Sequence, residues 1–195
     1  MIEGHSEIKQ IGSVSYMEGL HISQPINALK KLAEVIKDFD TIIEIGYYKG
    51  GLTYWLFKNK KDSAEVFSYD ISDANRDCHE AGINFLTKDC FLSEEEISQL
   101  ITRDGKTLIF CDGGFKNKEF NTFSKYLKTG DVIMLHDYHD DEQAEPYNSF
   151  DDSCGWVYPA ESNFSSIKGA VLEYGLEKFK YEDFRRVLIG SFIKK

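Results

Sequence analysis

Apolar residues recur along the chain with two alternating periods. Short apolar runs of strand length predict five strands, at residues 41–46, 65–70, 84–87, 107–111 and 132–136. Between and after them, apolar residues three or four apart predict helices. These helices cover residues 26–36, 51–57, 74–81, 93–102, 118–127 and 166–174. Such alternation is typical of a parallel sheet with helices on both faces.

The two ends of the chain depart from this alternation. Residues 1–23 show no clear period, and we expect a loop with a short helix that packs over the ligand-binding end. Residues 179–184 and 187–193 are strand-like and close together, which predicts an antiparallel pair at the sheet edge. The predicted fold is therefore α/β, a Rossmann-like doubly wound sheet, mostly parallel with a C-terminal antiparallel strand pair. It forms a single domain over residues 24–195, after the N-terminal segment 1–23.

Residues 137–165 form an acidic stretch with two prolines and no clear period. A loop of this length is uncommon unless it is functional or disordered. Aromatic rings stand among its carboxylates, at Tyr147, Phe150, Trp156 and Tyr158. We expect a lid over a ligand pocket, in which rings and carboxylates suit a polyhydroxylated ring such as a sugar. A solvated loop is the alternative.

Composition narrows the class of partner. The net charge is −10 over 195 residues, and no long Lys/Arg run offsets it, so nucleic acid is not expected as a substrate. Residues 1–10 are polar, and no apolar run approaches the roughly 20 residues of a membrane span. The four cysteines lack C-x-x-C spacing, which favours reduced structural cysteines and a cytoplasmic location. A homo-oligomer stays open.

Acidic residues and histidine stand where the predicted strands end, which is where ligands bind in doubly wound sheets. Gly46 follows the first strand and lets the chain turn tightly and a ligand approach the backbone. Asp70 ends the second strand, where a carboxylate can accept hydrogen bonds from ribose hydroxyls. The other strand ends carry Asp89, Asp112 and the pair His136 and Asp137.

Tyr48 separates two classes of ligand. Dinucleotide-binding proteins need G-x-G-x-x-G, because the backbone presses against a pyrophosphate. Tyr48 takes the second glycine position here, and its side chain would obstruct that approach. S-adenosylmethionine contains no pyrophosphate, so the pattern favours this cofactor over NAD.

Two stretches of the sequence resemble a known family. Residues 43–52, Ile-Glu-Ile-Gly-Tyr-Tyr-Lys-Gly-Gly-Leu, resemble the first motif of class I S-adenosylmethionine-dependent methyltransferases. Residues 111–119 and 127–138 resemble the cephalosporin hydroxylase and rhamnosyl O-methyltransferase-like branch, whose members have the methyltransferase fold. The resemblance covers about residues 24–193 and implies O-methylation of a hydroxyl on a small molecule or a sugar or glycan.

The resemblance also implies where the cofactor lies. The Glu44 position orients the loop, and the backbone of Gly46 lies against the cofactor. Asp70 binds the ribose, with Ile71 near the adenine. The implied cofactor-binding residues are Glu44, Gly46, Tyr47, Gly50, Gly51, Asp70, Ile71, Asp89, Cys90 and Asp112.

Some relatives hold a divalent metal with an acidic residue after the fourth strand and two polar residues after the fifth. The matching positions are Asp112, His136 and Asp137. A hard cation lowers the pKa of a substrate hydroxyl and positions its oxygen. His136 stands where an oxygen ligand is usual, and imidazole suits manganese, iron or zinc better than magnesium. Magnesium, manganese and a metal-free strand end all stay open.

Methyl transfer to a hydroxyl needs a proton acceptor. Besides Asp112, Lys116 is a candidate if burial depresses its pKa, and His139 is another because its usual pKa is near neutrality. Both could instead be surface residues. Two other classes remain: a non-haem iron oxygenase that uses His136, Asp137 and His139, and a non-catalytic cofactor-binding protein.

Overall fold

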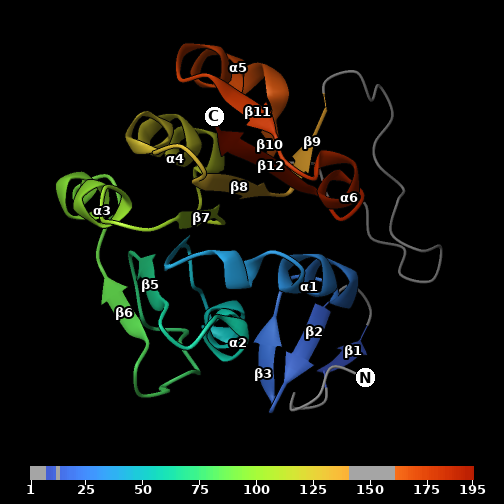
Figure 1. Ribbon diagram of the computed structural model, residues 1–195. Helices are drawn as coiled ribbons and strands as arrows, with labels where there is room; N and C mark the ends of the chain where they lie inside the picture. The colour runs from blue at the N-terminus through green and yellow to red at the C-terminus, as the bar shows by residue number, and fades with distance from the viewer. Residues whose placement is uncertain (1–7, 12–13, 141–160) are drawn as a thin grey trace.

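A seven-stranded sheet forms the centre of the computed structural model, which describes residues 8–11, 14–140 and 161–195 (Figure 1). The strand order is β11-β12-β8-β7-β4-β5-β6. Its parallel part contains β4 (Thr41–Ile45), β5 (Glu65–Asp70), β6 (Asn84–Thr87), β7 (Thr107–Cys111) and β8 (Val132–His136). All five predicted strands are therefore present, and the predicted doubly wound fold is confirmed.

The C-terminal strands complete the sheet in the opposite direction. β12 (Ile189–Lys194) is antiparallel to β8 and to the edge strand β11 (Leu176–Lys178). The predicted antiparallel pair is confirmed, but the strand expected at residues 179–184 was wrong. That stretch leads into the short helix α6 (Tyr181–Arg185), in which Tyr181 and Phe184 are both buried, each in a different hydrophobic core.

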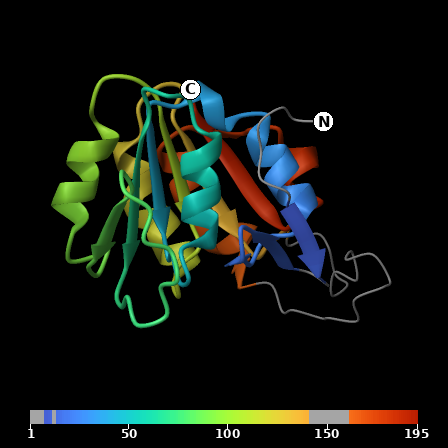
Figure 2. The same ribbon diagram turned by 90° about the horizontal axis from the view of Figure 1, so that it is seen from below.

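Helices cover both faces of the sheet (Figures 1 and 2). One core lies between the sheet and α1 (Ile26–Ala33), α2 (Gly51–Asn59) and α6. The other lies beneath α3 (Glu94–Ile101), α4 (Lys116–Phe123) and α5 (Phe164–Glu173). Short 3₁₀ turns follow α1 and α4, at Ile36–Asp38 and Ser124–Tyr126.

The helix predicted at residues 74–81 is absent. Within that stretch only Cys78 is buried, so the segment has no apolar face that would stabilise a helix against the sheet. It forms turns and irregular backbone instead.

The N-terminal segment also differs from the expected loop and helix. Its described residues form an antiparallel sheet of β1 (Ile8–Ile11), β2 (Val14–Met17) and β3 (Leu20–Ile22). Met17 and Ile22 are buried in the same core as α2. A Cβ atom at Gly51 would lie 1.9 Å from the carbonyl oxygen of His21, so glycine permits β3 to pack against the start of α2.

Two short strands frame the predicted lid. β9 (Tyr138–His139) pairs in parallel with β10 (Ser162–Asn163), so the chain on either side of residues 141–160 is held together. Residues 141–160, which carry most of the predicted lid, lie outside the described residues. The lid therefore stays a prediction, and α5 begins at Phe164, earlier than expected.

The sheet topology creates one crevice. From β4 the chain moves outward to β5 and β6, then returns to place β7 on the other side of β4. At this reversal the chain leaves β4 for α2 on one face of the sheet and leaves β7 for α4 on the other face, and such switch points are where ligands bind in open α/β sheets. No helix in the described part of the chain is long and apolar enough to span a membrane.

Candidate functional site

The larger of two neighbouring cavities lies over the carboxyl ends of β4, β5, β6 and β7. Its volume is about 300 Å³, at the lower end of the range for small-molecule sites. Residues from the end of each strand line it, as the predicted strand-end pattern requires. From the predicted cofactor residues it is lined by Gly46, Asp70, Ile71, Asp89, Cys90 and Asp112.

The smaller cavity lies on the other side of the loop after β4. Its volume is about 210 Å³. Among the predicted residues it is lined by Glu44, Gly46, Tyr47, Gly51 and Asp112. The two cavities share Gly46, Tyr48 and Asp112, so they meet at the crevice between β4 and β7. Gly50 lines neither cavity; it precedes α2 with φ +80°.

Gly46 is required where the two cavities meet. Its φ is +91°, and a Cβ atom there would lie 2.4 Å from the carbonyl oxygen of Asp112. The backbone after β7 is thus pressed against the backbone after β4, with the amide of Asp112 donating to the carbonyl of Ile45 at 2.8 Å. Only glycine fits this close approach.

Asp70 is held by the backbone of neighbouring loops. Its Oδ2 accepts the amide of Tyr48 at 2.9 Å, and its Oδ1 accepts the amide of Ser72 at 3.3 Å. Each carboxylate oxygen keeps a further lone pair for a ligand hydroxyl. Tyr48 adopts a left-handed backbone with φ +45°, which is costly for a bulky residue and tends to occur at functional sites.

Apolar side chains are exposed around the larger cavity. Ile71 is 77% exposed and Phe115 is 69% exposed, and both line the cavity. Large apolar groups exposed together at a cavity mark a binding surface. They suit a flat apolar ring, which would cover them.

Asp89 and Cys90 form the side of the larger cavity next to β6. Asp89 Oδ1 accepts the amide of Phe91 at 2.7 Å, which fixes the carboxylate. Burial raises the pKa of the Cys90 thiol to about 12, so the thiol stays neutral and unreactive. In the described part of the chain the cysteines are Cys78, Cys90 and Cys111, all buried and unbridged, as expected for reduced structural residues.

Glu44 lies on β4 beneath the smaller cavity. Its carboxyl is 1% exposed and accepts the hydroxyls of Thr53 and Ser68, the latter at 2.6 Å. Burial raises the pKa of Glu44 to about 8, although the two hydroxyls favour the charged form. The neighbouring carboxylates of Asp112 and Asp70 raise it further. At neutral pH this group is therefore largely protonated in the free protein.

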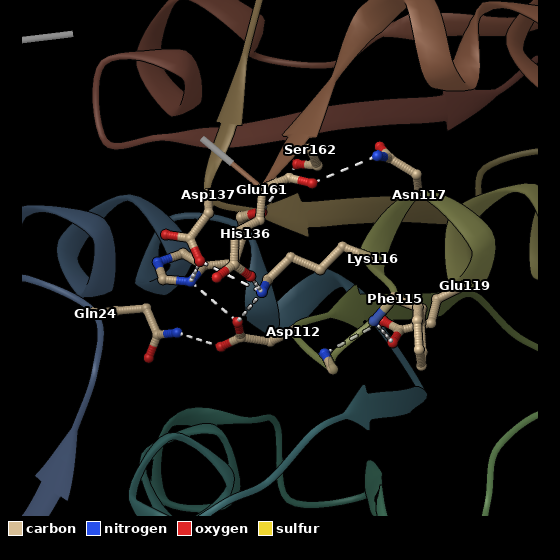
Figure 3. A network of polar contacts seen from close by, with 11 residues as sticks. Gln24, Asp112, Phe115, Lys116, Asn117, Glu119, His136, Asp137, Glu161 and Ser162 are labelled. Atoms are coloured by element: carbon tan, nitrogen blue, oxygen red, sulfur yellow. Dashed lines mark hydrogen bonds and ion pairs between the residues drawn. The ribbon is translucent and has the colours of Figure 1, made fainter. Parts of the chain in front are cut away.

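A polar cluster stands at the ends of β7 and β8, made of Asp112, Lys116, His136 and Asp137 (Figure 3). His136 Nδ1 lies 3.0 Å from Asp112 Oδ1 and 3.4 Å from Asp137 Oδ2. Lys116 Nζ lies 3.8 Å and 3.4 Å from the same two oxygens. Lys116 also pairs with Glu161. Three carboxylates thus surround two basic groups, and of the three only Glu161 lies largely exposed.

Both basic groups of the polar cluster are cations in the free protein. Burial alone would lower the pKa of His136, but Asp112 and Asp137 overcome it and raise that pKa to about 10. Burial acts in the same direction on Lys116, yet Glu161, Asp112 and Asp137 raise its pKa. The condition under which Lys116 could act as the base, a pKa depressed by burial, is therefore not met, because the carboxylates outweigh desolvation.

The polar cluster also fits a divalent cation. Donor atoms of Asp112, His136 and Asp137 all lie within 4.8 Å of one another. Metal–ligand bonds of about 2.1 Å at right angles put adjacent donors about 3.0 Å apart, close to the 3.0 and 3.4 Å around His136 Nδ1. When His136 is neutral, the positive charges of a divalent cation and of Lys116 balance the negative charges of the three carboxylates, which include Glu161.

His139 does not join this cluster. It lines neither cavity, and its buried Nδ1 has no hydrogen-bond partner among the residues described. The candidate metal group pairs His136 and Asp137 with Asp112 instead. The arrangement of two histidines and one carboxylate expected for an iron oxygenase does not form within the described ranges.

Two residues at the site were not among those predicted from the sequence. Gln24 is fully buried, and its Nε2 donates to Asp112 Oδ2 at 2.6 Å. Glu119 accepts the amides of Gly113 and Phe115, and burial raises its pKa to about 7. The contact of Gln24 depends on tertiary packing, whereas Glu119 caps amides four and six residues before it at the start of α4, a local signal in the sequence.

The fold is similar to that of solved methyltransferases. CmcI, in a form with magnesium and S-adenosylmethionine, is 17% identical at a TM-score of 0.60, over 91% of this chain and 75% of that one. Human N-acetylserotonin methyltransferase in complex with S-adenosylmethionine is 12% identical to this chain at a TM-score of 0.53. The match covers 87% of this chain and 50% of that one. MycE methyltransferase of the mycinamycin biosynthetic pathway, in complex with Mg and SAH, is 11% identical at a TM-score of 0.51. The match covers 89% of this chain and 49% of that one.

No protein-family model matches the chain, and no curated protein matches its sequence. The structural likeness therefore concerns the fold. In strand order, in the antiparallel C-terminal pair and in its solved neighbours, this chain has the class I methyltransferase fold that the sequence predicted.

Proposed function

We propose that this protein is an S-adenosylmethionine-dependent O-methyltransferase that acts on a hydroxyl of a small molecule or sugar. One observation carries the proposal: two cavities with different linings meet over Gly46, next to the polar cluster. A ligand with a nucleoside at one end and an amino acid at the other matches this shape.

The larger cavity suits the nucleoside end. The fixed carboxylate of Asp70 accepts hydrogen bonds from ribose hydroxyls. Ile71 and Phe115 pack against the adenine and become covered by it. Asp89 and Cys90 line the wall that faces the ring edge.

The polar cluster stands where the two ends of the ligand meet. S-adenosylmethionine supplies an electrophilic methyl group on a sulfonium. Asp112 lines both cavities, so its carboxylate can accept a hydrogen bond from the acceptor hydroxyl and take its proton, while Asp137 shares the contact with His136. Lys116, as a cation, contacts both carboxylates and holds them in place. We assign no step to His139, which lies outside the candidate metal group.

A divalent metal fits the same cluster. Asp112, His136 and Asp137 would hold it, and it would supply Lewis-acid activation of the hydroxyl. Support comes from CmcI, solved with magnesium and S-adenosylmethionine, and from MycE, solved with Mg and SAH. Magnesium or manganese is the metal we expect.

Asp70 offers a direct test. We expect Asp70→Ala to weaken S-adenosylmethionine binding about tenfold or more, because hydrogen bonds to a charged group are lost, and to reduce transfer of labelled methyl to hydroxylated acceptors. Asp73→Ala, in the exposed loop nearby, should change neither. Equal affinity in the two variants would show that the ribose does not bind at Asp70.

A further inference from the structure

The side-chain amide of Gln24 has a hydrogen-bonded nitrogen and an oxygen without a hydrogen-bond partner among the described residues. It precedes Pro25, the N-cap residue of α1, and is fully buried. Its Nε2 donates to Asp112 Oδ2 at 2.6 Å (Figure 3). Its Oε1 is buried as well, with no hydrogen-bond partner among the described residues. A buried acceptor without a donor is unfavourable, so this oxygen is suited to a ligand donor.

The neighbouring carboxylate determines which way the amide of Gln24 faces. An ionised Asp112 accepts hydrogen bonds and cannot donate them. Turning the amide over would therefore bring two acceptor oxygens to about hydrogen-bond distance with no proton between them. The unpaired atom of Gln24 is thus its carbonyl oxygen, which can only accept.

Gln24 lines the smaller cavity, whose walls carry opposite polarity. Acceptor groups come from Gln24, Glu44 and Asp112. Lys49, in the turn before α2, and Gly51, the first residue of α2, line the same cavity. The first amides of a helix lack partners within the helix and favour an anion. The cavity therefore offers acceptors for an ammonium and donors for a carboxylate, which together match a free amino acid group.

We propose that Gln24 is a specificity-determining residue for the amino-acid end of the cofactor. Its carbonyl oxygen accepts a hydrogen bond from the α-ammonium, while its amide continues to hold Asp112. This inference rests on the proposed function and adds a residue from the N-terminal segment to the site. It also links the two halves of the site, because the residue that binds the ammonium directs Asp112 Oδ1 toward His136.

The test compares two ligands that share a nucleoside. S-adenosylhomocysteine carries the amino acid group, and 5′-methylthioadenosine lacks it. In Gln24→Met, a side chain of similar length without donor or acceptor, we expect affinity for S-adenosylhomocysteine to fall about tenfold or more. Affinity for 5′-methylthioadenosine should change less than about twofold, because that ligand makes no contact with Gln24. Gln99→Met, on the exposed side of α3, is the matched control and should change neither.

Other outcomes overturn the proposal. Equal loss of affinity for both ligands would mean that Gln24 only supports the fold, and no loss for either would mean that it does not contact the ammonium. If the variant fails to fold, the wild-type protein decides: an S-adenosylhomocysteine analogue without the α-amino group must bind about tenfold or more weakly than the parent, and equal affinity refutes the inference. If the wild-type protein binds neither nucleoside, the proposed function itself fails.

Discussion

At the scale of single residues, buried carboxyl groups dominate the site. Glu44 and Glu119 lie in the cavity walls with pKa values raised by burial to about 8 and about 7. The carboxylates of the polar cluster instead face basic groups, and the pKa of Asp137 is lowered because His136 and Lys116 outweigh its burial. At neutral pH Glu44 is thus mostly protonated and Glu119 about half protonated in the walls, whereas basic partners favour the charged form of Asp137.

The raised pKa of Glu44 predicts a pH dependence of stability. Its pKa is 4.5 when exposed and about 8 when folded, so between these values the folded state binds more protons. The free energy of unfolding of the ligand-free protein must therefore decrease as pH rises from 4.5 to 8. Glu44→Gln mimics the protonated acid, so its free energy of unfolding should fall less between pH 4.5 and 8. Glu95→Gln, at an exposed position of α3, should show the same fall as the wild-type protein. Chemical denaturation at several pH values measures the free energy of unfolding across this range. If it changes with pH in parallel for the wild-type protein and Glu44→Gln, the raised pKa of Glu44 is contradicted.

The polar cluster predicts divalent cation binding. Manganese has a paramagnetic signal that diminishes on binding to protein, so titration followed by electron paramagnetic resonance reports occupancy directly. We expect Asp137→Asn to weaken manganese binding at least about tenfold, since it removes a charged ligand. Asp183→Asn, in an exposed ion pair with Lys31, should have no effect. If the wild-type protein leaves the manganese signal unchanged, the metal has no place in the proposal.

The sequence predicted those site residues that lie at or directly after the end of a predicted strand. Asp70, Asp89 and Asp112 could be grouped because parallel strands end at one edge. Gln24 lies 88 positions before Asp112, and their contact arises from tertiary folding. The pKa of Lys116 also depended on Glu161, which no local pattern joins to it.

At the scale of elements, the loops after β4 and β7 control the site. Gly46→Ala should lower the free energy of unfolding by more than about 1 kcal/mol, because alanine strains the left-handed backbone and its Cβ meets Asp112. Gly169→Ala is the contrasting control. It lies in α5 with open space around it, and removing helix flexibility should raise stability by roughly 0.5–1 kcal/mol. Chemical denaturation measures the free energy of unfolding of both variants. A Gly46→Ala protein as stable as the wild type would refute the close approach of the backbones at Gly46 and Asp112.

Elements were predicted correctly where burial and period agree. All five positions of β4, β7 and β8 are buried, so their apolar runs were sufficient evidence. β1 and β2 are four residues long and mix polar with apolar side chains, too short for a period to emerge. Residues 181–185 formed a helix because tertiary packing of Tyr181 and Phe184 outweighed their strand propensity.

At the scale of the whole molecule, three layers and one topological reversal produce the site. The reversal between β4 and β7 creates the crevice, and the N-terminal sheet packs against α2 and delivers Gln24 beside Asp112. The chain reversal follows from the class I methyltransferase fold, whereas the added sheet could not be foreseen from residues 1–23. The complete site therefore depends on segments at both ends of the sequence.

The measurement that most directly tests this account is calorimetric titration of the purified protein with S-adenosylmethionine, alongside NAD and 2-oxoglutarate. We expect S-adenosylmethionine to bind with one molecule per chain, because the two cavities match its nucleoside and amino-acid ends. NAD should not bind, since Tyr48 stands where a dinucleotide needs glycine, and 2-oxoglutarate should not bind because the described residues form no iron triad. Absence of S-adenosylmethionine binding, or binding of NAD in its place, would contradict the central claim.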